Sequence, residues 1–113
     1  MELALAQLTT AGIVGMIDNR RADLIYRFKS VFSDGAILEM VIWKIPTPVA
    51  GSMHLYKYRL YWGRNNERIV GYDNERGKGD HCHLDGKEHP YCFISPEALI
   101  NDFYAEIGKR MIR

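Results

Sequence analysis

The sequence is poor in the features that mark several classes of protein. Its 113 residues include two cysteines, Cys82 and Cys92, too few for the disulfide framework of a small secreted domain. The chain has no apolar run of the roughly 18 residues that a transmembrane helix needs. Its formal net charge is +1, so there is no global excess of positive charge, and any electrostatic specialisation must be local.

The N-terminal segment lacks the pattern of a signal peptide. Residues 1–17 are mildly apolar, but they have neither a basic start nor a continuous apolar centre. We therefore expect a protein of the reducing cytoplasm, without membrane association. Gly12 and Gly15 weaken the helical pattern, so residues 1–20 are interpreted as an extension or a short helix. Residues 21–113 are long enough for one hydrophobic core and are predicted to form a single α+β domain.

Alternating apolar and polar side chains predict several strands. Residues 24–32 alternate, and Ser33, Asp34 and Gly35 then suit a tight hairpin. Further strands are predicted over residues 36–45, 53–62 and 68–72. The short segment 91–94 fits either a fifth strand or an extended approach to a helix. Because the connections are short, the sheet is expected to be an antiparallel meander.

A helix is predicted after Phe93. Ser95 is a good N-cap, Pro96 suits the first helical position, and Glu97 complements the positive end of the helix dipole. Apolar residues then recur at spacings of three and four, forming a stripe: Leu99, Ile100, Phe103, Tyr104, Ile107 and Met111. The predicted fold class is therefore α+β, with an antiparallel sheet of four to five strands packed against a C-terminal helix.

The stretch 72–83 does not follow the pattern of core and surface. It holds three carboxylates, two cations and two histidines, with no large apolar residue after Tyr72. We interpret it as a polar loop on the sheet, where binding and catalytic groups tend to gather. The candidate catalytic residues in it are Asp73, Glu75, Arg76, Asp80, His81 and His83.

Acid–base chemistry and phosphate binding would suit these residue types. An unperturbed histidine titrates near neutral pH, so His81 or His83 could transfer a proton, with Asp73 or Asp80 orienting it. Basic residues on the predicted strands would share the sheet face away from the helix, beside Tyr61, where they could bind RNA phosphates. The predicted nucleic-acid contacts are Arg27, Lys29, Lys57, Arg59 and Lys78. The alternative is that all these charges are solvated or paired with each other.

Histidines and carboxylates also raise the question of a metal site. His81, His83 and His89, together with Asp80 or Asp85, would supply suitable ligand atoms. The spacings of the common zinc modules are absent, however, and Cys82 would face away from His81 and His83 in an extended chain. We therefore predict no metal and no other cofactor, while a small metalloenzyme remains an open alternative.

Four runs of the sequence resemble a known family: RADLIYRFKSVFSDGAILEMVIWKIP, YKYRLYWG, RIVGYDNERGKGDHCH and PYCFISPEALINDFYAEI. They are similar to the TumE-like toxin components of bacterial type II toxin–antitoxin systems, over residues 21–107. The most distinctive part is the run YDNERGKGDH. This resemblance implies a toxin encoded beside a cognate helix-turn-helix antitoxin, but it implies no catalytic residues.

Together these observations predict a toxin that acts on RNA through residues 72–83, as a ribonuclease-type enzyme without a metal. A second interpretation is a non-catalytic binding module that docks a protein partner or an anion through the same residues. We also expect a homodimer, because an exposed sheet edge favours pairing between copies.

Overall fold

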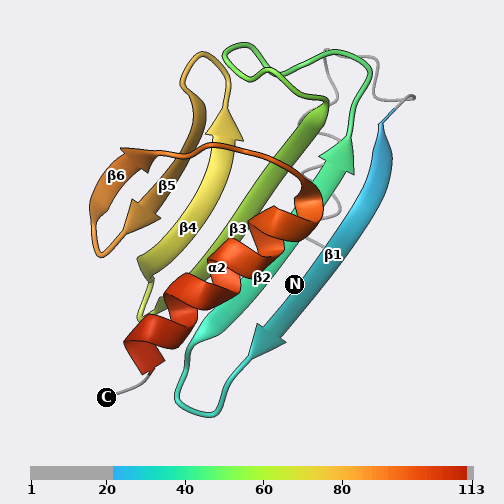
Figure 1. Cartoon of the computed structure of the whole chain (residues 1–113). Helices are drawn as coiled ribbons and strands as arrows, with labels where there is room; N and C mark the ends of the chain where they lie inside the picture. Colours follow the sequence, from blue (N-terminus) through green and yellow to red (C-terminus); the bar gives the residue numbers. More distant parts are fainter. Residues whose placement is uncertain (1–21, 112–113) are drawn as a thin grey trace.

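Six antiparallel strands form one meander sheet in the computed structural model, which describes residues 22–111. In chain order they are β1 (Asp23–Val31), β2 (Ile37–Lys44), β3 (Tyr56–Arg64), β4 (Glu67–Glu75), β5 (Gly79–Leu84) and β6 (Lys87–Pro90), and each pairs with the next. Helix α2 (Pro96–Met111) lies across one face of the sheet and packs on β3 and β4 (Figure 1). The predicted α+β meander with a C-terminal helix is confirmed, and the short helix proposed for residues 1–20 lies outside the described residues.

The predictions of a loop at 72–83 and of four to five strands were wrong. This stretch is the β4–β5 hairpin, which turns at residues 76–78, where the Lys78 amide donates to the Glu75 carbonyl at 2.9 Å. Gly77 adopts a φ of +84°, which the tight turn requires and a glycine allows without strain. β6 adds a further strand, whereas segment 91–94 forms none.

The hydrophobic core lies between α2 and the sheet. Alternate residues of β2, β3 and β4 point toward the helix, as the period of two in a strand requires. The buried core residues on the sheet are Leu38, Met40, Ile42, Tyr58, Leu60, Trp62, Val70, Tyr72 and Cys82, and those on α2 are Leu99, Phe103 and Ile107. The predicted apolar stripe is confirmed at its centre, while Tyr104 and Met111 are exposed at its margins.

The predicted start of the helix is also confirmed. Ser95 Oγ accepts a hydrogen bond from the Ala98 amide at 3.0 Å, which is the bond of an N-cap. Near the other end, the Arg110 guanidinium contacts Asp85 at 2.7 Å, and this pair joins α2 to the β5–β6 turn. No helix within residues 22–111 is long and apolar enough to cross a membrane.

Candidate functional site

The sheet face opposite α2, here called the far face, collects polar residues from several strands. The strand register aligns Arg27 of β1 with Val41, Arg59, Asp73 and finally His81 of β5. Residues paired in this way across antiparallel strands share one face. A sheet of adjacent hairpins therefore places a cation of β1 and a histidine of β5 on one surface, although they are far apart in the sequence.

Asp73, His81 and His83 form a compact cluster on the far face. Asp73 Oδ1 lies 2.6 Å from His81 Nε2, and the His81 and His83 rings meet edge to face with centroids 5.0 Å apart. Each residue offers one ligand or proton-transfer atom, and these atoms lie within 4.8 Å of one another. As predicted, His81 and His83 share a side of the strand, while Cys82 between them points into the core.

The hydrogen bond on the other side of the His81 ring determines which nitrogen carries the hydrogen. His81 Nδ1 lies 3.0 Å from the Gly79 carbonyl oxygen, which can only accept, so Nδ1 is the donor. In this tautomer His81 Nε2 keeps its lone pair. The two atoms approach closely, yet buried Asp73 Oδ1 has no hydrogen-bond partner among the described residues. The 2.6 Å contact is therefore short but is not aligned as a hydrogen bond.

Charged side chains surround this cluster. Glu88 Oε2 lies 3.6 Å from His81 Nε2 and 3.4 Å from Lys78 Nζ. Desolvation alone would raise the pKa of Glu88, but the Lys78 ammonium, together with His81 and His83, lowers the pKa overall. The pKa of His83 is also lowered, first by its burial and then by the positive charge of Arg68. Lys78 thus favours the ionised form of Glu88, and Arg68 favours the neutral form of His83.

Arg68 approaches His83 because Gly71 has no side chain. Gly71 is the cross-strand partner of His83, and a Cβ on Gly71 would lie 2.5 Å from Arg68 Cδ. The Arg68 side chain therefore crosses the space above the glycine. Sequence reasoning missed this residue, since an irregularity in the β3–β4 register near Gly63 changes which side chains of β4 face outward.

The other predicted cations also reach the far face. Glu39 lies between two of them, 3.2 Å from Lys29 Nζ and 3.9 Å from Arg59 Nη1. The Arg59 guanidinium lies over the Tyr61 ring, 5.5 Å from its centroid. Lys57 is on the same side of β3, two residues before Arg59. The far face therefore combines cations, an aromatic ring and the histidine cluster.

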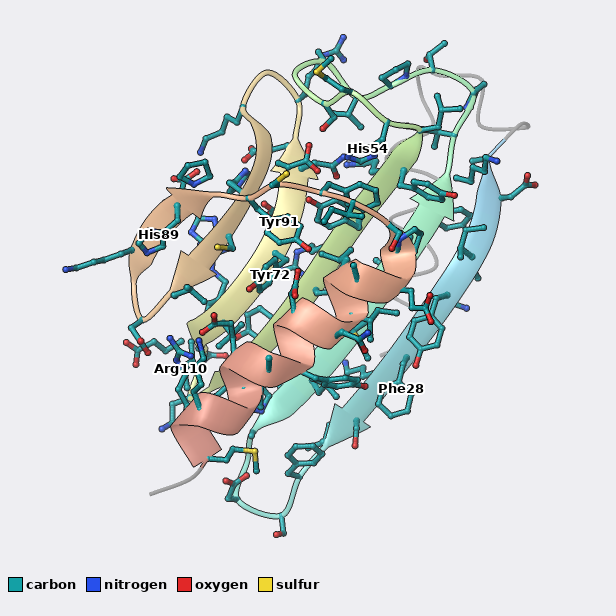
Figure 2. All side chains as sticks on the ribbon, in the orientation of Figure 1. Phe28, His54, Tyr72, His89, Tyr91 and Arg110 are labelled. Atoms are coloured by element: carbon teal, nitrogen blue, oxygen red, sulfur yellow. The ribbon has the colours of Figure 1, made fainter. Side chains whose placement is uncertain are left out.

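Asp80 faces α2 instead, away from His81 and His83. Its carboxylate accepts three hydrogen bonds, from Ser52 Oγ at 2.7 Å, His54 Nε2 at 2.7 Å and Tyr58 Oη at 2.6 Å. His54 Nδ1 accepts the Tyr56 amide at 3.1 Å, so Nε2 must be the protonated ring nitrogen. Figure 2 shows His54 where the segment before α2 crosses the sheet, and its ring stacks on Phe93 at 3.8 Å between centroids.

Asn74 completes this group, which we call the Asp80 network and which comprises Ser52, His54, Tyr58, Asn74 and Asp80. The Asn74 side chain accepts a hydrogen bond from the Tyr58 amide at 3.0 Å and donates one to the Tyr56 carbonyl at 2.7 Å. At this point of β3, these side-chain bonds take the place of backbone hydrogen bonds to β4. Desolvation alone would raise the pKa of Asp80, but its three donors lower it overall. Because its polar groups are mutually bonded, the network acts as a structural clamp.

The six predicted catalytic residues are thus divided among three places. Asp73, His81 and His83 are together on the far face, and Asp80 belongs to the Asp80 network. Glu75 and Arg76 are exposed at the β4–β5 turn, where Glu75 Oε1 lies 3.9 Å from Lys78 Nζ. Sequence reasoning did not single out Ser52 or His54, because no local pattern shows that the segment before β3 contacts Asp80.

The comparison with protein families defines the class of this small α+β protein as a toxin. A family model matches residues 11–111, almost the whole chain. The chain belongs to this family, whose description is Toxin TumE. The match confirms the resemblance found in the sequence and extends it beyond residues 21–107. Comparisons with curated proteins and with solved structures gave no match.

Proposed function

We propose that this toxin acts on RNA, and that Asp73, His81 and His83 are its catalytic residues. The observation that carries the proposal is the position of this cluster on the same sheet face as the cations. Arg59 is the cross-strand partner of Asp73, and the charge of Arg68 reaches His83. A chain with a net charge of only +1 thus presents a locally basic surface around two histidines.

The far face suits a nucleic acid in single-stranded form. Arg27, Lys57 and Arg59 would contact phosphates along the strands, and Lys78 would do so at the turn. Tyr61 offers a ring on which a base could stack, with the Arg59 guanidinium beside it. These contacts depend on charge and on ring faces, so they would bind RNA with little sequence preference.

The proposed reaction is cleavage by acid–base catalysis without a metal. His83, which is more exposed than His81, would take the proton from a ribose 2′-hydroxyl. The 2′-oxygen would attack phosphorus as the bond from phosphorus to the 5′-oxygen breaks, giving a 2′,3′-cyclic phosphate. His81, protonated on Nε2 beside Asp73, would give that proton to the leaving 5′-oxygen, and Arg59 and Arg68 would stabilise charge on the phosphoryl group.

A toxin that cleaves RNA in its own cell needs a neutralising partner. We propose a cognate antitoxin of the helix-turn-helix class, consistent with the toxin family of this chain. We also propose self-association through the outer edge of β1, where Leu24, Ile25, Phe28 and Val31 are exposed.

The test expresses the full chain from a tightly repressed promoter, and also assays the purified protein on RNA in the presence of EDTA. His83→Gln should lower the cleavage rate by about 100-fold or more, the usual loss of a general acid or base, and should abolish growth arrest. His89→Gln is the matched control, because His89 is exposed on β6 outside the cluster. Circular dichroism of each variant would verify folding.

Two results would overturn the proposal: intact RNA at every concentration of active toxin, or His83→Gln cleaving RNA like the parent. Growth arrest that persists in His83→Gln, without RNA loss, would favour the binding module instead. In that case the far face would hold a protein partner or an anion.

A further inference from the structure

We infer that Asp73, His81 and His83 bind a divalent transition cation of the zinc class. Two imidazoles and one carboxylate are ligands that zinc takes readily, and three protein ligands leave a fourth position for water. This ligand set differs from the sets considered in the sequence, because only the pairing of β4 with β5 brings Asp73 beside the histidines. Binding of the cation by the protein alone does not depend on the proposed action on RNA.

The first argument is the spacing of the ligand atoms. One atom from each residue lies within 4.8 Å of the others, and Asp73 Oδ1 is already 2.6 Å from His81 Nε2. A tetrahedral zinc ion with bonds of about 2.0–2.2 Å needs ligand atoms roughly 3.4 Å apart. The present separations bracket that value, since the three atoms lie between 2.6 and 4.8 Å apart.

The second argument is the orientation of His81. Its Nδ1 donates to the Gly79 carbonyl, and a backbone carbonyl in this place is a common partner of a metal-binding histidine. This hydrogen bond holds the ring and leaves the Nε2 lone pair available to a cation. The ring is also nearly enclosed, with a side chain only 5% exposed, so its orientation is fixed by its surroundings.

The third argument is the short contact between His81 and Asp73. Two electron-rich atoms 2.6 Å apart repel each other unless positive charge lies between them. A proton on Nε2 would also supply positive charge, but the pair does not have the geometry of a hydrogen bond, and Asp73 Oδ1 has no hydrogen-bond partner among the described residues. A cation can instead bind two atoms that converge on a common point.

Other ligand sets in this region are excluded by their contacts. Both oxygens of Asp80 accept hydrogen bonds on the opposite face, and Asp85 pairs with Arg110. His89 is exposed on β6 and pairs with Cys82, a core residue. Paired residues share one face of the sheet, so His89 lies on the face opposite the cluster. Mg²⁺ and Ca²⁺ prefer six or more oxygen ligands, which a site with two histidines does not supply.

Bound zinc would occupy His81 Nε2, the atom that must carry the proton for the leaving 5′-oxygen. On the proposed function, zinc should therefore inhibit RNA cleavage reversibly, and EDTA should restore it. The expected inhibition of RNA cleavage rests on the proposed function, whereas the binding of zinc to the protein does not.

The test uses the full chain, freed of metal by a chelator and titrated with ZnCl2 by calorimetry and with CoCl2 by visible absorption. The parent should bind about one equivalent, and bound Co²⁺ should give the intense bands of a four-coordinate site. Asp73→Asn and His83→Gln should each weaken binding by about 10-fold to 100-fold. His89→Gln should bind like the parent. Asp73→Asn keeps the size of the side chain, and it separates ligation from folding if circular dichroism is unchanged.

The inference is overturned if the parent shows no saturable binding at about 100 μM metal, or if His83→Gln and Asp73→Asn bind like the parent. The two proposals fail separately. Zinc binding by a protein that leaves RNA intact contradicts only the proposed function. RNA cleavage by a protein that binds no zinc contradicts only the metal site.

Discussion

Replacing Asp80 by asparagine should destabilise the fold through the Asp80 network. The Asp80 carboxylate accepts hydrogen bonds from Ser52, His54 and Tyr58, and its side chain is only 10% exposed. Asparagine has nearly the same shape, but it is neutral and one of its two polar atoms donates. The substitution therefore removes the charge while leaving the packing almost unchanged.

The size of the loss follows from the three hydrogen bonds. A hydrogen bond to a charged group stabilises a protein by about 2 kcal/mol, and one between neutral groups by about 1 kcal/mol. Each of the three donors to Asp80 should lose about half of its contribution, so we expect a decrease of about 3 kcal/mol in the free energy of unfolding. Tyr58→Phe removes only one donor and should cost about 1–2 kcal/mol.

Urea denaturation at pH 7, followed by tryptophan fluorescence, measures this difference. Asp102→Asn is the matched control, because the Asp102 carboxylate accepts a hydrogen bond from the Tyr91 hydroxyl at 2.6 Å and this bond is exposed to solvent. Water can replace that bond, so the control should lose less than about 1 kcal/mol. Equal stability of Asp80→Asn and the parent, or equal losses in Asp80→Asn and Asp102→Asn, would refute the reasoning.

The same network predicts how stability depends on pH. Its donors hold the pKa of Asp80 below the ordinary value of 3.8, so the folded state binds this proton less readily than the unfolded state. The contribution of Asp80 to the free energy of unfolding is therefore fully present above the unfolded-state pKa of 3.8. It is lost as the pH falls through the lower pKa of the folded state. The stability difference between the parent and Asp80→Asn should narrow below about pH 4. A constant difference down to pH 2 would contradict the assignment.

Two further substitutions test the turns and the helix start. Gly51→Ala should cost more than about 2 kcal/mol, because Gly51 has a φ of +102° and a Cβ there would lie 2.8 Å from the Gly79 amide nitrogen. Gly35→Ala is its control, with a φ of +90° but open space for a Cβ, and thermal unfolding should show the smaller loss. Ser95→Ala should cost about 1 kcal/mol, because the Ala98 amide loses its cap; an unchanged urea midpoint would count against this.

Local patterns were sufficient for most of the fold. The first three strands and α2 were located within a few residues, because each has a clear period that a buried face imposes. The β4–β5 hairpin was not recognised, since its polar residues hid the alternation. Asn74 is 1% exposed and His81 4%, although both types are usually found at the surface. Their partners come from distant parts of the chain, which a local pattern does not reveal.

The candidate site was predicted in part for the same reason. The spacing of His81 and His83 placed both on one side of an extended chain, and that prediction is confirmed. The choice between Asp73 and Asp80 as the neighbouring carboxylate could not be made from residue types. It depends on the strand register, which pairs Asp73 with His81 and turns Asp80 toward the opposite face.

The sequence by itself determined the α+β class, the meander and the helix start, because short-range periods and capping residues act within a few positions of the chain. It also carried the resemblance to the toxin family. Only the tertiary structure decided that Arg59, Asp73 and His81 lie side by side, and that Asp80 belongs to a clamp with His54. The physical reason is that register and long-range hydrogen bonds bring together strands whose separate sequences do not specify one another.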